Sequence, residues 1–130
     1  MKFKILSLML LSLIGATSVK NGEDAPLFNL LNQDDQTVSL EEFKGKKVVL
    51  EWTNHDCPFV KRHYDTGNMQ NLQKEMSDQD IVWLSIVSSA QGKQGHITKD
   101  QAKELTKKRS AHPAHVLLDV EGSVGRMFSA

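Results

Sequence analysis

Two apolar runs separated by a stretch of helical periodicity limit the possible folds of this chain more than any other feature. The runs are VVLEW, within residues 47–52, and IVWLSIV, at residues 81–87, and polar segments bound each of them. Apolar runs of this length indicate strands that lie in the centre of a sheet and are buried on both faces. Because strands alternate with helices, the order predicts an α/β fold with βαβ crossovers and a largely parallel sheet.

Shorter patterns predict the remaining elements: strands at 27–31, 37–40 and 115–119, helices at 58–77 and 98–108, and a helix or loop from residue 123 onward. Ser39 and Glu42 form a capping box for one helical turn. Thr66 and Gly67 are expected to interrupt or bend the first long helix. Thr98 is placed to cap the second helix.

The first 18 residues differ in character from the rest of the chain. Two lysines in MKFK precede an apolar run, and small residues around Ala16 follow it. This three-part layout is typical of a secretory signal peptide, and the run is shorter than the ~20 residues that a membrane-spanning helix needs. We expect cleavage after Ser18, a mature domain over residues 19–130, and export to the periplasm or beyond the cell.

Charge and cysteine content exclude several classes of function. The chain has 16 basic and 16 acidic residues, whereas a nucleic-acid partner requires a basic face. Cys57 is the only cysteine, so the chain forms no internal disulfide. It also lacks the Cys-x-x-Cys pair of many structural zinc sites.

Cys57 is the candidate reactive group. It directly precedes Pro58 at the point where the first apolar run gives way to the helical pattern. Proline is favoured in the first turn of a helix, so Cys57 is expected at a helix N-terminus, where free N–H groups and the helix dipole favour a thiolate. Lys61 lies one turn further on and supports the anion, whereas the Asp56 carboxylate opposes it. The alternative is a buried and inert cysteine.

Histidines near Cys57 raise the question of a metal site. His55 and His63 flank the cysteine, but His63 lies well inside the predicted helix and faces away from it. A metal site is therefore the less favoured interpretation, and no metal or other cofactor is expected. Trp52, Trp83 and Tyr64 fall in strand and helix patterns and are expected to be packing residues.

The segments APLFNL, VSLEEFKGKKVVLEW and EWTNHDCPFVKRHYDTGNMQNLQ resemble the alkyl hydroperoxide reductase/thiol-specific antioxidant (AhpC/TSA) redoxins and exported thioredoxin-like proteins of bacteria. The resemblance runs from about Gly22 to the end of the chain. It implies a thioredoxin-like fold, a three-layer α/β structure with a central sheet between helices. It also places Cys57 at the reactive cysteine of the family.

Two departures from the family pattern bear on the reaction. The second cysteine of thioredoxin-type reductases corresponds to Val60 here. Peroxiredoxins carry Pro-x-x-x-Thr/Ser-x-x-Cys, and the matching positions are Leu50 and Asn54, with Thr53 one residue away from the expected place. Neither an internal dithiol nor the standard peroxide pocket is present.

The resemblance implies a thiol oxidoreductase in which Cys57 attacks a small peroxide or disulfide substrate and an external thiol restores it. Lys61, with Arg62 as a second candidate, would support the anion, and Thr53 or Asn54 could donate a hydrogen bond to the substrate. The alternative is a non-catalytic thioredoxin-fold module that binds copper or a protein partner.

Family members continue after the position of Ala130 with a Thr-Pro motif, an antiparallel strand pair and a closing helix. We therefore expect a domain that is incomplete at its C-terminus, with an exposed sheet edge and marginal stability on its own.

Overall fold

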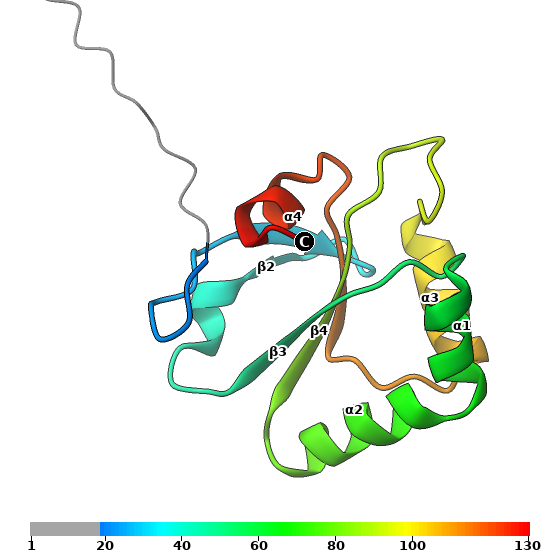
Figure 1. The fold of residues 1–130 in the computed structure, drawn as a ribbon, viewed down its shortest axis with the longest axis horizontal. Helices are drawn as coiled ribbons and strands as arrows, with labels where there is room; N and C mark the ends of the chain where they lie inside the picture. Colours follow the sequence, from blue (N-terminus) through cyan, green and yellow to red (C-terminus); the bar gives the residue numbers. More distant parts are fainter. Residues whose placement is uncertain (1–18) are drawn as a thin grey trace, which may run out of the picture.

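The computed structural model describes residues 19–130 (Figure 1). The expected signal peptide at residues 1–18 lies outside the described residues. The elements in chain order are β1 (Asn29–Asn32), β2 (Thr37–Ser39), the 3-10 helix η1 (Leu40–Phe43), β3 (Val48–Trp52), α1 (Pro58–Asp65), α2 (Asn68–Asp78), β4 (Val82–Val87), α3 (Lys99–Lys108), β5 (His115–Leu118) and α4 (Ser123–Phe128). Within residues 19–130, no helix combines the length and apolar character needed to cross a membrane.

The five strands form one mixed sheet in the order β2-β1-β5-β4-β3. Pairing is parallel from β3 to β4 and from β4 to β5, and β1 pairs antiparallel with both β2 and β5. The predicted α/β class is confirmed, with the parallel part of the sheet formed by the three strands that carry the longest apolar runs.

The prediction that residues 47–52 form a central strand buried on both faces is wrong. Strand β3 begins one residue later than expected, at Val48, and it lies at the edge of the described sheet, where it pairs only with β4. Each of its five residues is partly exposed. The apolar run arises because Val48, Leu50 and Trp52 all face one core, whereas the other face of the strand carries the charged residue Glu51.

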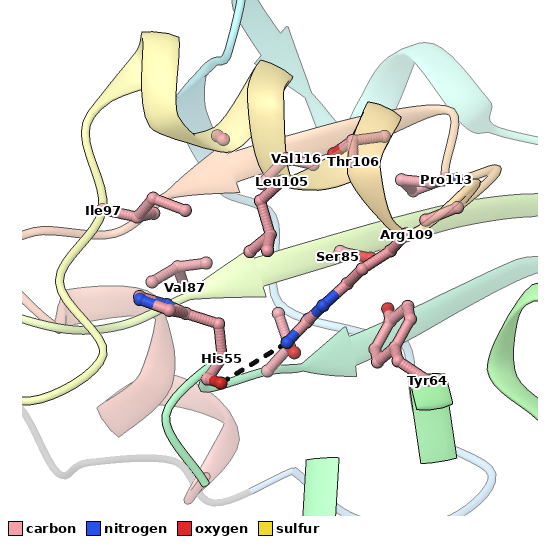
Figure 2. A pocket seen from close by; sticks show the side chains of 13 residues that line it. His55, Tyr64, Ser85, Val87, Ile97, Leu105, Thr106, Arg109, Pro113 and Val116 are labelled. Atoms are coloured by element: carbon pink, nitrogen blue, oxygen red, sulfur yellow. Dashed lines mark hydrogen bonds between the residues drawn. The ribbon is translucent and has the colours of Figure 1, made fainter. Parts of the chain in front are cut away.

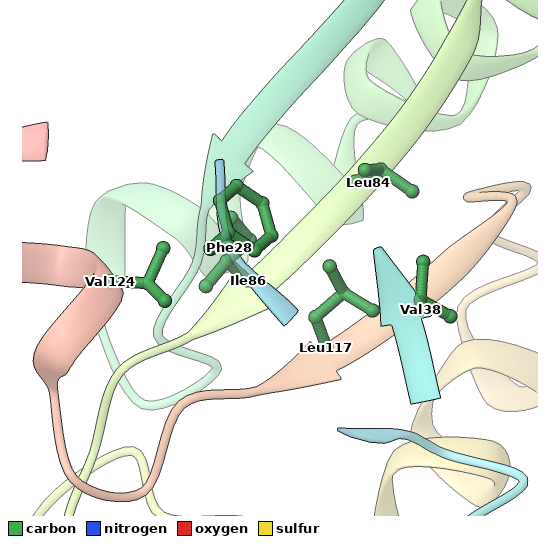
Figure 3. Packing of buried hydrophobic residues seen from close by; sticks show 6 residues of the cluster. All are labelled: Phe28, Val38, Leu84, Ile86, Leu117 and Val124. Carbon is green, nitrogen blue, oxygen red and sulfur yellow. The ribbon is translucent and has the colours of Figure 1, made fainter. Parts of the chain in front are cut away.

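That core occupies one face of the sheet (Figure 3). Its buried members come from the segment before β1, from strands β2, β4 and β5, and from α4: Phe28, Val38, Leu84, Ile86, Leu117 and Val124. The rings of Phe28 and Phe128 meet edge to face with centroids 5.8 Å apart, which anchors α4 to this face.

Helices α1 and α3 cover the opposite face of the sheet, away from α4 (Figure 1). Val87 and Val116 of the sheet pack there against Ala102 of α3 and Ile97 just before it. Thr98 caps α3 through a capping box with Gln101, as its position predicted.

The predicted interruption of the first long helix is also confirmed. Gly67 separates α1 from α2 and has φ of 75°, a left-handed conformation that glycine adopts at little cost. The turn allows α1 and α2 to run in different directions, so that α1 begins at the C-terminal end of β3 and α2 returns the chain to β4.

Candidate active site around Cys57

Cys57 is the N-cap residue of α1, as the strand–loop–Cys-Pro order predicted. Its backbone is extended, with φ of −68° and ψ of 126°, and Pro58 begins the helix. The Cys57 carbonyl accepts the first helical hydrogen bond from the Lys61 N–H at 2.9 Å. The thiol is free and half-buried, and it makes no capping hydrogen bond. The unpaired N–H groups of the first turn, beginning with Phe59, are therefore available to an anion at this position.

A tight turn carries the chain from β3 to Cys57. The Thr53 N–H donates to the Ile86 carbonyl at 2.9 Å and extends the pairing of β3 with β4. The Cys57 N–H then donates back to the Asn54 carbonyl at 3.0 Å, while the Asn54 side-chain oxygen accepts from the Asp56 N–H at 2.9 Å. Asn54, predicted as a substrate donor, thus uses its Oδ1 atom to hold the turn.

The loop after β4 packs onto this turn. The Gly95 N–H donates to Oδ2 of Asp56 at 3.2 Å. Gly95 has φ of +82°, and a Cβ atom at this position would lie 2.6 Å from Cγ of Asn54. Only glycine therefore allows so close an approach of the two loops without a shift of the Asn54 side chain or the backbone.

Arg109, the C-cap residue of α3, connects α3 to the turn before Cys57 and to α1. Its Nη2 donates to the His55 carbonyl at 3.4 Å, and its guanidinium carbon lies 4.5 Å from the centre of the Tyr64 ring (Figure 2). The first contact reaches the turn before Cys57, and the second reaches α1. A stacked and hydrogen-bonded arginine of this kind fixes the relative positions of the elements it contacts.

A carboxylate under α1 completes the support. Glu51 accepts hydrogen bonds from the Tyr64 hydroxyl at 3.0 Å, from Nε1 of Trp83 at 2.8 Å and from the Ser85 hydroxyl at 2.7 Å. Burial, reinforced by the neighbouring Glu51 carboxylate, raises the pKa of Tyr64 well above its usual range. Tyr64 therefore stays protonated and acts as the donor.

This network corrects the expectation that Tyr64 and Trp83 only pack, because both donate to Glu51. It extends into α2 through Gln73, whose Nε2 donates to the Tyr64 oxygen at 3.1 Å and whose Oε1 accepts from the His112 N–H at 2.8 Å. Sequence reasoning missed the network, although a glutamate inside the run VVLEW is a signal that could have identified it.

Thr53 lines a cavity of about 40 Å³ between the sheet and α3 (Figure 2). Its hydroxyl oxygen is buried and has no hydrogen-bond partner among the described residues. Other members of the wall are Ser85, Leu105 and Arg109. The Thr53 hydroxyl is thus enclosed in the wall of this cavity.

The remaining candidates lie on the surface of α1. Lys61 and Arg62 are exposed, and the Lys61 side chain lines a hollow between α1 and α3. His63 is also exposed, and its Nδ1 lies 3.1 Å from Nδ2 of Asn68. The Nε2 atom of His55 lies 3.7 Å from Oδ1 of Asp56. Across residues 19–130, no three His, Cys, Asp or Glu side chains lie together as metal ligands would.

Solved structures share this architecture. An uncharacterized conserved protein from Geobacillus kaustophilus is 23% identical, with a TM-score of 0.73 over 84% of this chain and 57% of its own. The exposed lipoprotein thioredoxin Etrx1 from Streptococcus pneumoniae is 27% identical, with a TM-score of 0.61 over 81% of this chain and 74% of its own. A protein assigned as the thiol:disulfide interchange protein DsbE from Chlorobium tepidum is 18% identical, with a TM-score of 0.67 over 87% of this chain and 72% of its own.

This chain covers less than two thirds of the G. kaustophilus protein, since the match takes in 57% of it. A comparison with curated proteins gives no match. The Redoxin family model, by contrast, matches residues 20–130, which is nearly the whole described chain. The protein therefore belongs to the Redoxin family and has a thioredoxin-like fold.

Proposed function

We propose that this protein is a thiol oxidoreductase whose single reactive group is the Cys57 thiolate. The observation that carries the proposal is the position of Cys57 as the N-cap of α1, half-buried and directly before Pro58, in a domain of the Redoxin family. Free N–H groups at the start of a helix stabilise a thiolate, which is the nucleophilic form of cysteine.

With a peroxide, the thiolate attacks one oxygen. A sulfur–oxygen bond forms as the oxygen–oxygen bond breaks, Cys57 is oxidised to a sulfenic acid, and the leaving oxygen takes up a proton as water or an alcohol. Val60 stands where a second cysteine would resolve this state, so an external dithiol supplies the two electrons. Its first thiol displaces water from the sulfenic acid, and its second then displaces the Cys57 thiolate.

With a disulfide, the thiolate attacks one sulfur and the other leaves as a thiolate. The product is a mixed disulfide on Cys57, which an external thiol resolves by a second exchange. Under this proposal Lys61 supports the anion, with Arg62 as a second candidate. Asn54, whose Oδ1 holds the turn, donates a hydrogen bond to the substrate through Nδ2, and the buried Thr53 hydroxyl is the other candidate donor. No step requires a cofactor.

The proposed place of action is outside the cytoplasm. The support is the signal-peptide pattern of residues 1–18, together with the resemblance to exported redoxins. Cleavage after Ser18 would leave a mature protein that begins at Val19. Mass spectrometry of the exported protein tests this, and an intact Met1 would contradict it.

The reaction is tested by turnover of the full chain. We expect the protein to consume hydrogen peroxide, or to reduce a small disulfide, only when an external dithiol is added. Cys57→Ser should abolish this turnover, because the chain has no other cysteine. The control is His63→Gln, which changes an exposed residue of the same helix that has no role in the proposed reaction. Thermal melting of both variants establishes that they are folded.

The same measurements distinguish the proposed oxidoreductase from the main alternative, a non-catalytic binding module. A folded protein whose turnover is unchanged in Cys57→Ser has a structural thiol, and the proposal is then wrong. A wild-type protein that shows no turnover and whose thiol alkylates slowly would instead favour a thioredoxin-fold module that binds copper or a protein partner.

A further inference from the structure

The surface beside Cys57 is hollowed between α1 and α3. This hollow has a volume of about 430 Å³. His55 and Asp56 of the turn before Cys57 form one end of it. Lys61 of α1 lines one side, and Lys108 and Arg109 at the end of α3 line the other. Cys57 does not itself line the hollow, but the two residues that precede it do.

Three basic side chains that form no ion pair within the described part of the chain line the hollow, and they outnumber its carboxylates. Lys61 and Lys108 make no ion pair with any residue of the described range 19–130, and Arg109 makes none either. The Nη2 atom of Arg109 donates to the His55 carbonyl, which is a neutral acceptor, at 3.4 Å.

Two carboxylates also line the hollow. Asp56 is already engaged, because it accepts the Gly95 N–H at 3.2 Å and lies 3.7 Å from His55. Asp65 is the other. Three cations thus face one engaged and one free carboxylate, and an incoming anion would meet a net positive field.

The residues that line the hollow lie next to the thiol along the chain. His55 and Asp56 immediately precede Cys57, and Lys61 lies one helical turn after it. We propose that the hollow binds the anionic group of the substrate, so that the protein prefers disulfides or peroxides that carry a carboxylate close to the reacting atom. The inference rests on the proposed function, because it names the substrate class of the same thiol.

Lysines in the last turn of a helix also suit the helix dipole, which offers a purely structural explanation for Lys107 and Lys108. The two residues differ in one respect: Lys108 lines the hollow and Lys107 does not. Lys107→Gln is therefore a matched control for Lys108→Gln, with the same loss of charge in the same helical turn.

The test uses iodoacetate and iodoacetamide on the full chain. In both reactions the Cys57 thiolate displaces iodide, so a carbon–sulfur bond forms as the carbon–iodine bond breaks, and the reagents differ by one negative charge. The measured quantity is the ratio of the two second-order rate constants. We expect Lys108→Gln to lower this ratio about twofold to threefold at low salt, and Lys61→Gln with Lys108→Gln to lower it about fivefold. Lys107→Gln should leave it unchanged, and added salt should reduce the wild-type ratio.

A second pair of reagents extends the test to the proposed reaction. 3,3′-Dithiodipropionate is anionic and bis(2-hydroxyethyl) disulfide is neutral, and their rates of mixed-disulfide formation should show the same pattern across the variants. If Lys108→Gln changes neither ratio, or if Lys107→Gln lowers them equally, the inference is overturned while the proposed function stands. If alkylation shows the charge preference but neither disulfide nor peroxide reacts, the hollow attracts anions and the proposed oxidoreductase function fails.

Discussion

Replacing Gly95 by alanine would test how closely two loops pack around Cys57. The substitution has two separate costs. Alanine in the left-handed conformation of Gly95, with φ of +82°, costs about 1–2 kcal/mol. Its Cβ atom would also lie 2.6 Å from Cγ of Asn54, and forcing an atom into such a space typically costs about 1–3 kcal/mol. We therefore expect Gly95→Ala to lower the free energy of unfolding by about 2–5 kcal/mol.

Gly92→Ala is the matched control. Gly92 lies in the same loop with φ of +76°, but a Cβ atom there would meet nothing within 4 Å. It shares the conformational cost of Gly95→Ala, and also the effect of alanine on the unfolded chain, so the difference between the two variants isolates the contact with Asn54. Urea unfolding followed by the fluorescence of Trp52 and Trp83 measures both free energies.

A double variant identifies the atom responsible. Asn54→Ala removes Cγ, so the added cost of Gly95→Ala in that background should fall to about the cost of Gly92→Ala, which is about 1–2 kcal/mol. If Gly95→Ala destabilises the wild-type chain no more than Gly92→Ala does, the close approach of the two loops is wrong. The same holds if Asn54→Ala gives no relief.

Other substitutions test the supports of the site. Glu51→Ala should lower the free energy of unfolding by about 2–4 kcal/mol, because it leaves the buried donors of Tyr64, Trp83 and Ser85 without their acceptor; a loss below about 1 kcal/mol in urea unfolding would contradict the network. Arg109→Lys keeps the charge but loses the planar stacking on Tyr64, and should cost about 1 kcal/mol in the same assay. Asp119 should make stability depend on acid: burial favours its neutral form, but hydrogen bonds from Ser88, Gly125, Val124 and Ser123 outweigh this and lower its pKa below the usual 3.8. Since the folded pKa is the lower one, the unfolded chain binds more protons, and the contribution of Asp119 is present above about pH 4 and lost as the pH falls through the folded pKa. The difference in unfolding free energy between wild type and Asp119→Asn should accordingly stay constant from pH 6 to about pH 4 and shrink below that, and a difference that stays constant down to about pH 3 would refute the assignment.

The parts of the fold that sequence could predict are those that depend on local patterns. Three such features each follow from a few adjacent residues: the capping box at Thr98, the break at Gly67 and the place of Cys57 before α1. The position of β3 at the sheet edge does not, because strand order depends on pairings between distant segments. In β3 the alternate residues Val48 and Leu50 face a single core. A short apolar segment of this kind resembles, in sequence, a strand that is buried on both faces.

The side chains that hold the candidate site in place could not be predicted from sequence for the same reason. The three donors to Glu51 and the Arg109 contact with His55 join residues that are 13, 32, 34 and 54 positions apart in the chain. No spacing rule links such residues, so the sequence located Cys57 without the side chains that hold it. The charged residue in an apolar strand was nevertheless visible, and its burial required partners.

Glu51 also explains how the edge strand β3 is held to α1 and to β4, because its carboxylate accepts hydrogen bonds from side chains of both. A carboxylate is tolerated there because three buried side chains donate hydrogen bonds to it: Tyr64, Trp83 and Ser85. Tyr64, one of these donors, lies seven residues after Cys57 on α1, so the same carboxylate fixes the rotation of the helix that presents the thiol. A change at Glu51 should therefore alter the alkylation rate of Cys57 as well as stability, whereas a change of equal stability cost in the opposite core, such as Val124→Ala, should alter stability alone. Equal effects of the two variants on the alkylation rate would show that Glu51 supports the fold and not the thiol.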